Sequence, residues 1–258
     1  MIVMQYAKQG SLRKLLDSKY NDLNWDYKII ILYYIANGLN AIHEAKLMHK
    51  DFHSGNIVNR DMISSYITDF GLCKPVSQDS STEGMFGVIP YIAPEVLYTG
   101  GKEYTQKSDI YSFGIIMSEV FTGYPPYHDI PHNKDLAIKI CLGYRPKINC
   151  EIPRLLLDLM NKCLDARPQN RPDAKELANI LNQFYKDLKN EWTELSKQVK
   201  EIKNSSKISN QIISTRLNYQ THKQATYTSR FLNYQNLPKP INFKTIFAES
   251  KPIDIEIP

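Results

Sequence analysis

The sequence lacks a long hydrophobic run. Its longest apolar stretch covers residues 29–36, far short of the roughly 20 residues that a membrane-spanning helix needs. No basic segment followed by an apolar core and a cleavage site opens the chain, so no secretion signal is expected. Hydrophobic residues make up 42% and charged residues 23%, which is ordinary for a globular protein. We therefore expect an intracellular, cytoplasmic protein without a membrane span.

Cysteine pairs and glycine-rich loops are also missing. The four cysteines form no C-x-x-C pair and have no histidine at metal-ligand spacing, which predicts reduced, structural thiols. The eleven glycines include no G-x-G-x-x-G, the pattern of a loop that covers nucleotide phosphates. The chain itself therefore offers no glycine-rich cradle for a phosphate group.

The positive charge is confined to one end of the chain. From Lys189 onward there are eleven of the 32 basic and six of the 27 acidic residues, which accounts for the whole net charge of +5. The preceding residues are neutral overall and show no basic groove with aromatic stacking platforms. We therefore expect no nucleic-acid partner.

Two short polar loops lie between apolar runs in the first third of the chain. The first reads HKDFHSGN over residues 49–56, and the second reads DFG over residues 69–71. Phosphoryl transfer from a nucleotide needs oxygen ligands for Mg²⁺ and a carboxylate that orients the acceptor hydroxyl and takes its proton. Asp51 suits the second task, and Asn56 and Asp69 suit the first. The alternative is two turn aspartates and a helix cap.

These loops resemble those of the protein kinase family, whose catalytic loop reads H-R-D-x-x-x-x-N and whose metal loop reads D-F-G. Residues 93–95 add the family's A-P-E in the same order along the chain. D-F-G alone would be weak, but three motifs with family-like gaps are rare by chance. The resemblance implies a kinase that uses ATP, Mg²⁺ and protein substrates, with catalytic Asp51, Asn56 and Asp69, the last two on the metal.

The resemblance also implies a nucleotide site that includes the start of the chain. Residues 1–7 are β-branched and aromatic enough to form the strand that enters the kinase hinge. Gln5 to Ala7 would offer backbone groups to the adenine edge, and Val58 would lie beneath the ring. An ordinary core strand is the alternative, because one strand carries no chemistry of its own.

Several positions depart from the usual family pattern. Lys50 replaces the arginine that commonly pairs with an activation-loop phosphate, and it lacks the bidentate geometry. His53 stands where many Ser/Thr kinases carry a lysine, so it would supply a hydrogen bond but less charge. Residues 77–82 would belong to a mobile activation loop, phosphorylated by an upstream kinase or by the protein itself. Val88 replaces the threonine that Ser/Thr kinases usually carry, which blurs the distinction between Ser/Thr and Tyr specificity. Ser/Thr acceptors are expected, and Tyr acceptors stay open.

Other residues receive structural roles from the resemblance. His49 would pack under Phe70, the residue before Gly71 in the metal loop. Asp109, at the start of an apolar helix, would hold the catalytic-loop backbone through hydrogen bonds. The alternative for Asp109 is an ordinary acidic residue in the first helical turn.

Glu95 and Arg171 are expected to form a buried ion pair. The resemblance pairs the glutamate of A-P-E with this arginine. Each charge lies in an apolar, proline-flanked segment, where removing one would leave the other uncompensated.

The hydrophobic pattern predicts a mainly α fold with short β-hairpins, a kinase-like C-terminal lobe plus the hinge strand. Residues 26–45 and 104–122 are apolar on nearly all faces, which is typical of buried helices. A last helix begins after Asp173, and its core face is expected to continue through Trp192, Leu195, Val199 and Ile202.

Three segments are predicted. Residues 1–188 would be the kinase domain with its N-terminal lobe largely missing, and residues 189–203 a helical extension. Residues 204–258 contain too few periodic apolar residues to bury a core, so we expect a basic tail that is disordered or only loosely docked.

Two functions remain open. The first is a protein kinase in intracellular signalling, and the second is a non-catalytic, kinase-like interaction module. Retention of Asp51, Asn56 and Asp69 favours the kinase. The absent glycine-rich loop and strand lysine favour the module, and they predict negligible turnover by these 258 residues alone.

Overall fold

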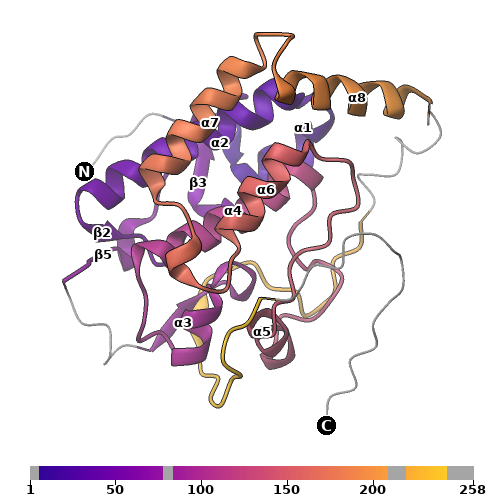
Figure 1. Cartoon of the computed structure of the whole chain (residues 1–258). Helices are drawn as coiled ribbons and strands as arrows, with labels where there is room; N and C mark the ends of the chain where they lie inside the picture. Colours follow the sequence, from indigo (N-terminus) through magenta and orange to yellow (C-terminus); the bar gives the residue numbers. More distant parts are fainter. Residues whose placement is uncertain (1–5, 78–83, 209–218, 243–258) are drawn as a thin grey trace.

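The computed structural model describes residues 6–77, 84–208 and 219–242 (Figure 1). Most of its regular structure is helical, in agreement with the predicted mainly α fold. Residues 1–5 of the expected strand, with the predicted site residue Gln5, lie outside the described residues, and Tyr6 and Ala7 belong to no strand. No helix within the described ranges is long and apolar enough to cross a membrane.

The elements follow one another as helices separated by short strands. The helices are α1 (Leu12–Lys19), α2 (Trp25–Glu44), α3 (Pro94–Thr99), α4 (Gln106–Thr122), α5 (Lys134–Cys141), α6 (Arg154–Cys163), α7 (Ala174–Asp187) and α8 (Glu194–Ile208). The strands are β1 (Gly10–Ser11), β2 (Leu47–Met48), β3 (Ile57–Asn59), β4 (Ser65–Ile67), β5 (Lys74–Pro75), β6 (Met85–Gly87) and β7 (Arg230–Leu232).

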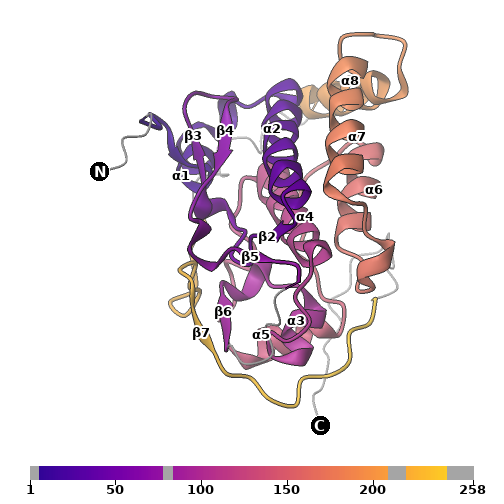
Figure 2. The same cartoon turned by 90° about the vertical axis from the view of Figure 1, so that its left-hand side faces the viewer.

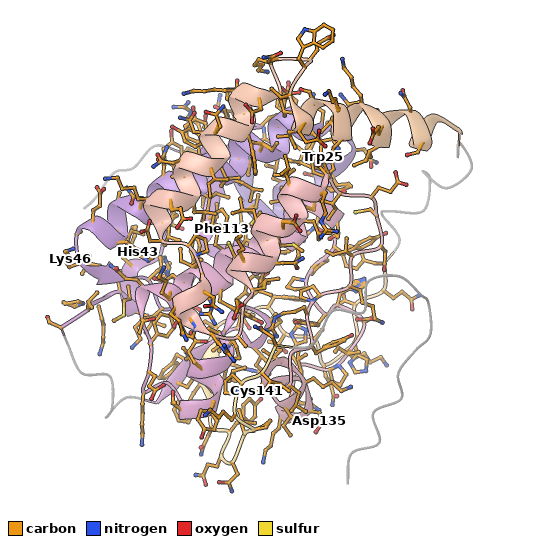
Figure 3. All side chains as sticks on the ribbon, viewed as in Figure 1. Trp25, His43, Lys46, Phe113, Asp135 and Cys141 are labelled. Carbon is orange, nitrogen blue, oxygen red and sulfur yellow. The ribbon has the colours of Figure 1, made fainter. Side chains whose placement is uncertain are left out.

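Helices α2 and α4 form the centre of the core, with α7 packed against α2 and α6 against α4 (Figure 1). Asn24 caps α2 by accepting a hydrogen bond from the Tyr27 N–H, and Thr105 opens α4 with a capping box. From Ser108 to Thr122 every residue of α4 is buried, and Phe113 lies deep in the molecule (Figure 3). Gly123 ends α4 in the left-handed conformation, with φ of 79°.

Short antiparallel ladders position the two polar loops. Strand β3 lies between β1 and β4, and β2 pairs with β5. The loop at residues 49–56 therefore connects β2 to β3, and the D-F-G loop connects β4 to β5. The predicted β-pairs around both loops are confirmed.

The predicted continuation of α7 is wrong. Asp173 caps α7 as expected, accepting from the Glu176 N–H at 2.7 Å, but α7 ends at Asp187. Asn190 accepts from the Trp192 N–H, and Thr193 accepts from the Ser196 N–H, so these side chains turn the chain and start α8. Leu195 and Val199 are buried as expected, whereas the Trp192 side chain is 85% exposed. Helix α8 also extends beyond residue 203.

The predicted ion pair between Glu95 and Arg171 is present and buried. Arg171 donates from both terminal nitrogens to the two carboxylate oxygens, at 2.8 Å each. Arg171 also donates to the backbone carbonyls of Lys107 and Asp165, and Ser108 donates to Glu95. The pair therefore joins the A-P-E segment to the start of α4 and the segment before α7.

Residues 219–242 pack along the body, so for this part of residues 204–258 the structure agrees with docking rather than with disorder. Strand β7 pairs with β6, and Figure 2 shows the two strands side by side. The segment is anchored by hydrogen bonds rather than by a hydrophobic repeat: the N–H groups of His222 and Ile241 donate to carbonyls of His128 and Cys141. Leu232 and Leu237 are buried, but they follow no helical or strand period that would predict packing.

Replacing Arg171 with alanine should lower the free energy of unfolding by about 3 to 5 kcal/mol, because Glu95 would keep a buried, uncompensated charge. Arg154→Ala is the matched control, since it removes an exposed ion pair with Asp158 and should cost only about 0.5 kcal/mol. Urea unfolding of both variants checks the difference. Equal costs would contradict the stabilising role of the buried pair.

Docking of residues 219–242 should weaken on acidification. Burial lowers the pKa of His132, which faces Arg230, His128 and Tyr227, and burial also lowers the pKa of His128. The docked state then binds fewer protons than the undocked state, so docking is lost as pH falls below about 6.5. The Thr226 amide, which donates to His132, should exchange hydrogen faster at pH 5.5 than at 7.5 after correction for intrinsic rates.

Replacing both His128 and His132 with glutamine should remove most of this pH dependence, because neither position could then titrate. A pH dependence that persists in this double variant would show that other groups control docking.

Candidate active site

Asp109 fixes the backbone of the catalytic loop. Its fully buried carboxylate accepts hydrogen bonds from four groups: the N–H of His49 at 2.9 Å, the N–H of Lys50 at 3.2 Å, the Tyr104 hydroxyl at 2.8 Å and His43 Nε2 at 3.0 Å. Lys50 has a φ of 68°, an unfavourable conformation for a side chain with a β-carbon. The two amide hydrogen bonds to Asp109 offset that cost, and burial together with Asp109 raises the pKa of Tyr104.

Asp51 lies in this loop with one oxygen free for a ligand. The residue is only 7% exposed, and Asn56 Nδ2 donates to its backbone carbonyl at 2.9 Å and to Oδ2 at 3.3 Å. Among the described residues, no hydrogen-bond partner reaches the buried Oδ1. A buried, unpartnered carboxylate oxygen is costly, and such groups are found where a substrate proton or hydroxyl completes the site.

His53 lies beside Asp51. Its Nδ1 accepts from the Gly55 N–H at 3.0 Å, which assigns the ring proton to Nε2. Nε2 lies 3.7 Å from Asp51 Oδ2, and the ring stacks obliquely on Tyr91 at 5.7 Å. His53 therefore presents an N–H beside Asp51 rather than the flexible cation that a lysine would provide.

The D-F-G loop is brought to the catalytic loop by the β3–β4 hairpin. The N–H of Thr68 donates to the Asn56 carbonyl at 2.8 Å. Asp69 is the next residue along the chain, so this hydrogen bond brings it close to Asn56. Asp69 has a φ of 60°, and its Oδ1 accepts from the Gly71 N–H at 3.4 Å. His49 donates to the Thr68 carbonyl and contacts the Phe70 ring, with centroids 5.7 Å apart, as expected.

The donor set fits Mg²⁺ better than a metal with an all-protein cage. Within the described ranges no three His, Cys, Asp or Glu side chains gather into a metal site. Mg²⁺ keeps several waters and needs only one or two protein oxygen ligands when phosphate supplies the others. Asn56 and Asp69 each carry a side-chain oxygen of the kind that Mg²⁺ prefers.

The structure brings only part of the predicted adenine site together. Ala7 is half-buried and its carbonyl accepts from the Gly10 N–H in a turn. Val58 lies in β3, the central strand of the three-stranded sheet, where it pairs with Ser11 of β1 and Tyr66 of β4.

The predicted phosphate partner of Lys50 lies almost wholly outside the described residues. Lys50 Nζ lies 5.8 Å from the centre of the Tyr104 ring. The phosphate would come from residues 77–82, of which only Ser77 is described.

A second buried acid, Glu119, was not predicted. Its carboxylate accepts from Arg13 at 2.9 Å, from Ser54 at 3.1 Å and from Tyr91 at 2.8 Å. Burial raises the pKa of Glu119, and the Arg13 guanidinium opposes that shift. The network ties α1 and α4 to the catalytic loop and to the segment after β6. A lone acid in an otherwise apolar stretch of α4 was the available signal.

Replacing Asp109 with asparagine should lower the free energy of unfolding by about 3 kcal/mol, because a carboxamide cannot accept from all four buried donors. The amides of His49 and Lys50 should also exchange faster. Asp135→Asn, at the exposed first turn of α5 (Figure 3), is the control and should cost about 0.5 kcal/mol. Urea unfolding with site-resolved amide exchange makes the comparison, and unchanged exchange at both catalytic-loop amides would refute the anchoring role.

Comparison with known proteins agrees with this geometry. Residues 1–181 match the sequence model described as "Protein tyrosine and serine/threonine kinase". The chain is 35% identical over 190 residues to "Receptor-interacting serine/threonine-protein kinase 4" of Mus musculus, a match that covers 69% of this chain and 24% of the relative.

Relatives from distant organisms give the same picture. The chain is 35% identical over 196 residues to "Probable serine/threonine-protein kinase roco8" of Dictyostelium discoideum (71% of this chain, 10% of the relative). It is 31% identical over 194 residues to "Calcium/calmodulin-regulated receptor-like kinase 2" of Arabidopsis thaliana (70% and 44%). The chain thus spans less than half the length of these curated relatives. With the family model matching most of its residues, the chain belongs to the protein tyrosine and serine/threonine kinase family.

Proposed function

We propose that the protein transfers the γ-phosphate of ATP to serine or threonine hydroxyls of protein substrates. The observation that carries this proposal is the unpartnered, buried Oδ1 of Asp51, held by Asn56 next to the D-F-G loop. An acceptor hydroxyl would supply the missing hydrogen-bond donor. The same contact would orient the hydroxyl for attack on phosphorus.

Each residue has one task in this reaction. The bond from the acceptor oxygen to the γ-phosphorus forms while the bond from that phosphorus to the leaving ADP oxygen breaks. Asp51 accepts the proton that the hydroxyl releases. Asn56 and Asp69 would hold Mg²⁺, which supplies positive charge against the phosphate oxygens. The His53 N–H can donate a hydrogen bond beside Asp51.

The acceptor class is inferred from the relatives rather than from a pocket. The matched proteins quoted above that carry a specificity in their names are named serine/threonine kinases. Val88 stands in the segment after β6, where Ser/Thr kinases usually carry a threonine, so this position does not itself favour Ser/Thr acceptors. A peptide library tests the acceptor class, and transfer to tyrosine peptides would contradict the inference.

A non-catalytic interaction module is the second candidate. It is favoured by the absence of any G-x-G-x-x-G from the 258 residues, since the phosphates would be contacted only from the side of Asn56 and Asp69. Pre-placed donors contribute about 3 kcal/mol each to the transition state, so lacking several should lower turnover by roughly 10⁴ or more.

Asp51→Asn should reduce transfer of radiolabel from ATP to a peptide library to the level without protein, because asparagine cannot take the hydroxyl proton. Asp22→Asn, at an exposed position outside the site, should leave transfer unchanged. The unsubstituted chain should transfer label only at the negligible rate expected of these 258 residues alone, so a long incubation is needed to resolve its transfer from that background.

The three proteins together separate the two candidates. Equal transfer by Asp51→Asn and the unsubstituted chain would remove the role given to Asp51. Robust turnover by the unsubstituted chain would contradict the expected loss of rate. No transfer by any of them would favour the interaction module.

A further inference from the structure

Strand β6 ends beside the free oxygen of Asp51. A β-carbon built on Gly87, the last residue of β6, would lie 3.7 Å from Asp51 Oδ1. Four residues later, Tyr91 bonds to Ser54 of the catalytic loop and contacts the His53 ring. Whatever pairs with the edge of β6 is therefore delivered to the candidate active site.

The edge of β6 is occupied by the chain's own residues 230–232. The pairing is antiparallel, with Leu232 opposite Met85, Phe231 opposite Phe86 and Arg230 opposite Gly87 (Figure 2). An added strand of almost any sequence can form hydrogen bonds with the backbone groups of an exposed edge. Pockets for alternate side chains then determine which sequences bind best.

Three side-chain positions distinguish this edge. Leu232 is buried, whereas Phe231 packs edge-on against Phe86 with ring centroids 5.3 Å apart and remains 57% exposed. A β-carbon on Gly84 would lie 2.1 Å from the Phe231 ring, so glycine there leaves room for an aromatic residue. The edge therefore fits an aromatic residue followed by an aliphatic one.

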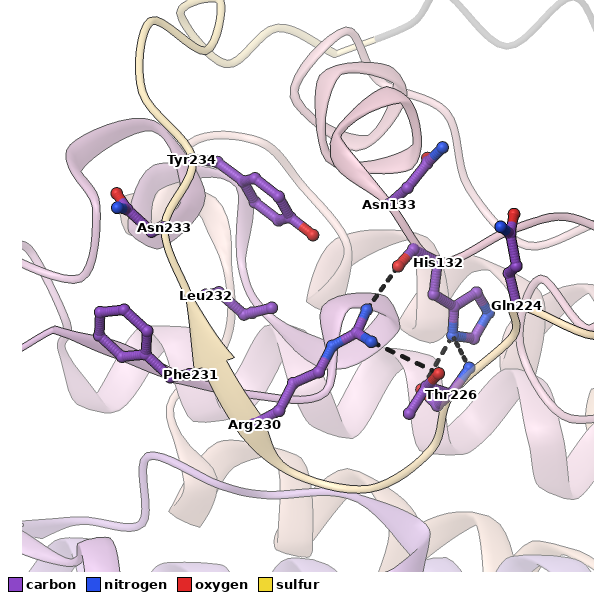
Figure 4. Close-up of a pocket in the computed structure, with 9 residues that line it drawn as sticks. All are labelled: His132, Asn133, Gln224, Thr226, Arg230, Phe231, Leu232, Asn233 and Tyr234. Carbon is purple, nitrogen blue, oxygen red and sulfur yellow. Dashed lines mark hydrogen bonds between the residues drawn. The ribbon is translucent and has the colours of Figure 1, made fainter.

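Arg230 supplies a basic residue before them. Its guanidinium donates to the His132 carbonyl at 2.5 Å and to the Thr226 hydroxyl at 3.5 Å (Figure 4). A cavity of about 500 Å³ opens between Arg230, His132, Asn133 and Tyr234. The contact beside β7 is therefore loosely packed, and a two-stranded ladder of three residues is only marginally stable.

We propose that the edge of β6 docks an extended polypeptide substrate with a basic, an aromatic and an aliphatic residue in succession, and that Arg230, Phe231 and Leu232 occupy it in competition with that substrate. That the docked polypeptide is a substrate rests on the proposed kinase function, whereas its docking at the edge of β6 does not depend on that function. Because the pairing is antiparallel, residues before the basic position continue beyond Gly87 along Val88. A docked substrate would carry its acceptor hydroxyl there, where the chain itself has exposed Thr228 and Ser229.

Release of the chain's own strand should open the edge to a peptide added in trans. Leu232→Asp removes the buried anchor, and Asn233→Asp is the matched control because it adds the same charge at the neighbouring exposed position. The probe is a fluorescent peptide with the sequence of residues 224–238, measured without ATP. An intramolecular occupant competes at an effective concentration near millimolar, so Leu232→Asp should bind the peptide at least 10-fold more tightly than the unsubstituted chain or Asn233→Asp.

Hydrogen exchange of the β6 amides independently tests whether the edge is occupied. The amides of residues 85–87 should exchange faster in Leu232→Asp than in the control, and added peptide should restore their protection. A peptide that carries the Leu232→Asp change should not bind. The double variant Arg230→Ala/Phe231→Ala repeats the test with two side chains that are not buried, in case Leu232→Asp does not fold.

The outcomes separate docking from catalysis. Equal peptide binding and equal exchange in all variants would overturn the docking proposal, even where phosphoryl transfer is observed and the proposed function stands. Peptide binding that follows the prediction would support docking, even where no phosphoryl transfer occurs and the proposed function falls.

Discussion

The candidate active site depends on one buried carboxylate with four hydrogen-bond donors. Asp109 receives two of these from successive backbone N–H groups of the catalytic loop, which are aligned only because Lys50 adopts a positive φ. A buried carboxylate without partners would be strongly destabilising, so the loop and the acid stabilise one another. That mutual requirement places Asp51 immediately beyond the anchored backbone.

Helix α4 supplies the support for the remaining parts of the site. Near its start, Ser108 and the Lys107 carbonyl bind the Glu95–Arg171 pair, and near its end Glu119 binds Arg13, Ser54 and Tyr91. A helix buried on every face can hold such charges only where partners from other segments satisfy them. Catalytic loop, A-P-E segment and the segment after β6 therefore share one rigid support.

The helices and the short β-pairs could be predicted because motif spacing and all-round apolar helices are local signals. The Glu95–Arg171 pair joins residues 76 positions apart and was predicted from the resemblance to the kinase family. The Arg13–Glu119 contact was missed because its partners are 106 residues apart. The place where residues 219–242 dock was not predicted, because docking there depends on pairing with β6 and on bonds to His128 and His132, not on hydrophobic period. The break between α7 and α8 was missed because a continuing apolar stripe conceals the capping role of Thr193.

The central claim is that Asn56 and Asp69 hold a divalent cation together with nucleotide phosphate beside Asp51. Paramagnetic broadening of backbone amide signals by Mn²⁺, added with ATP as a substitute for Mg²⁺, tests this most directly. The account predicts that signals of residues 51–56 and 68–71 broaden first, and that Asp69→Asn abolishes the effect. Broadening that begins at other acidic residues, or that is unchanged in Asp69→Asn, would contradict it.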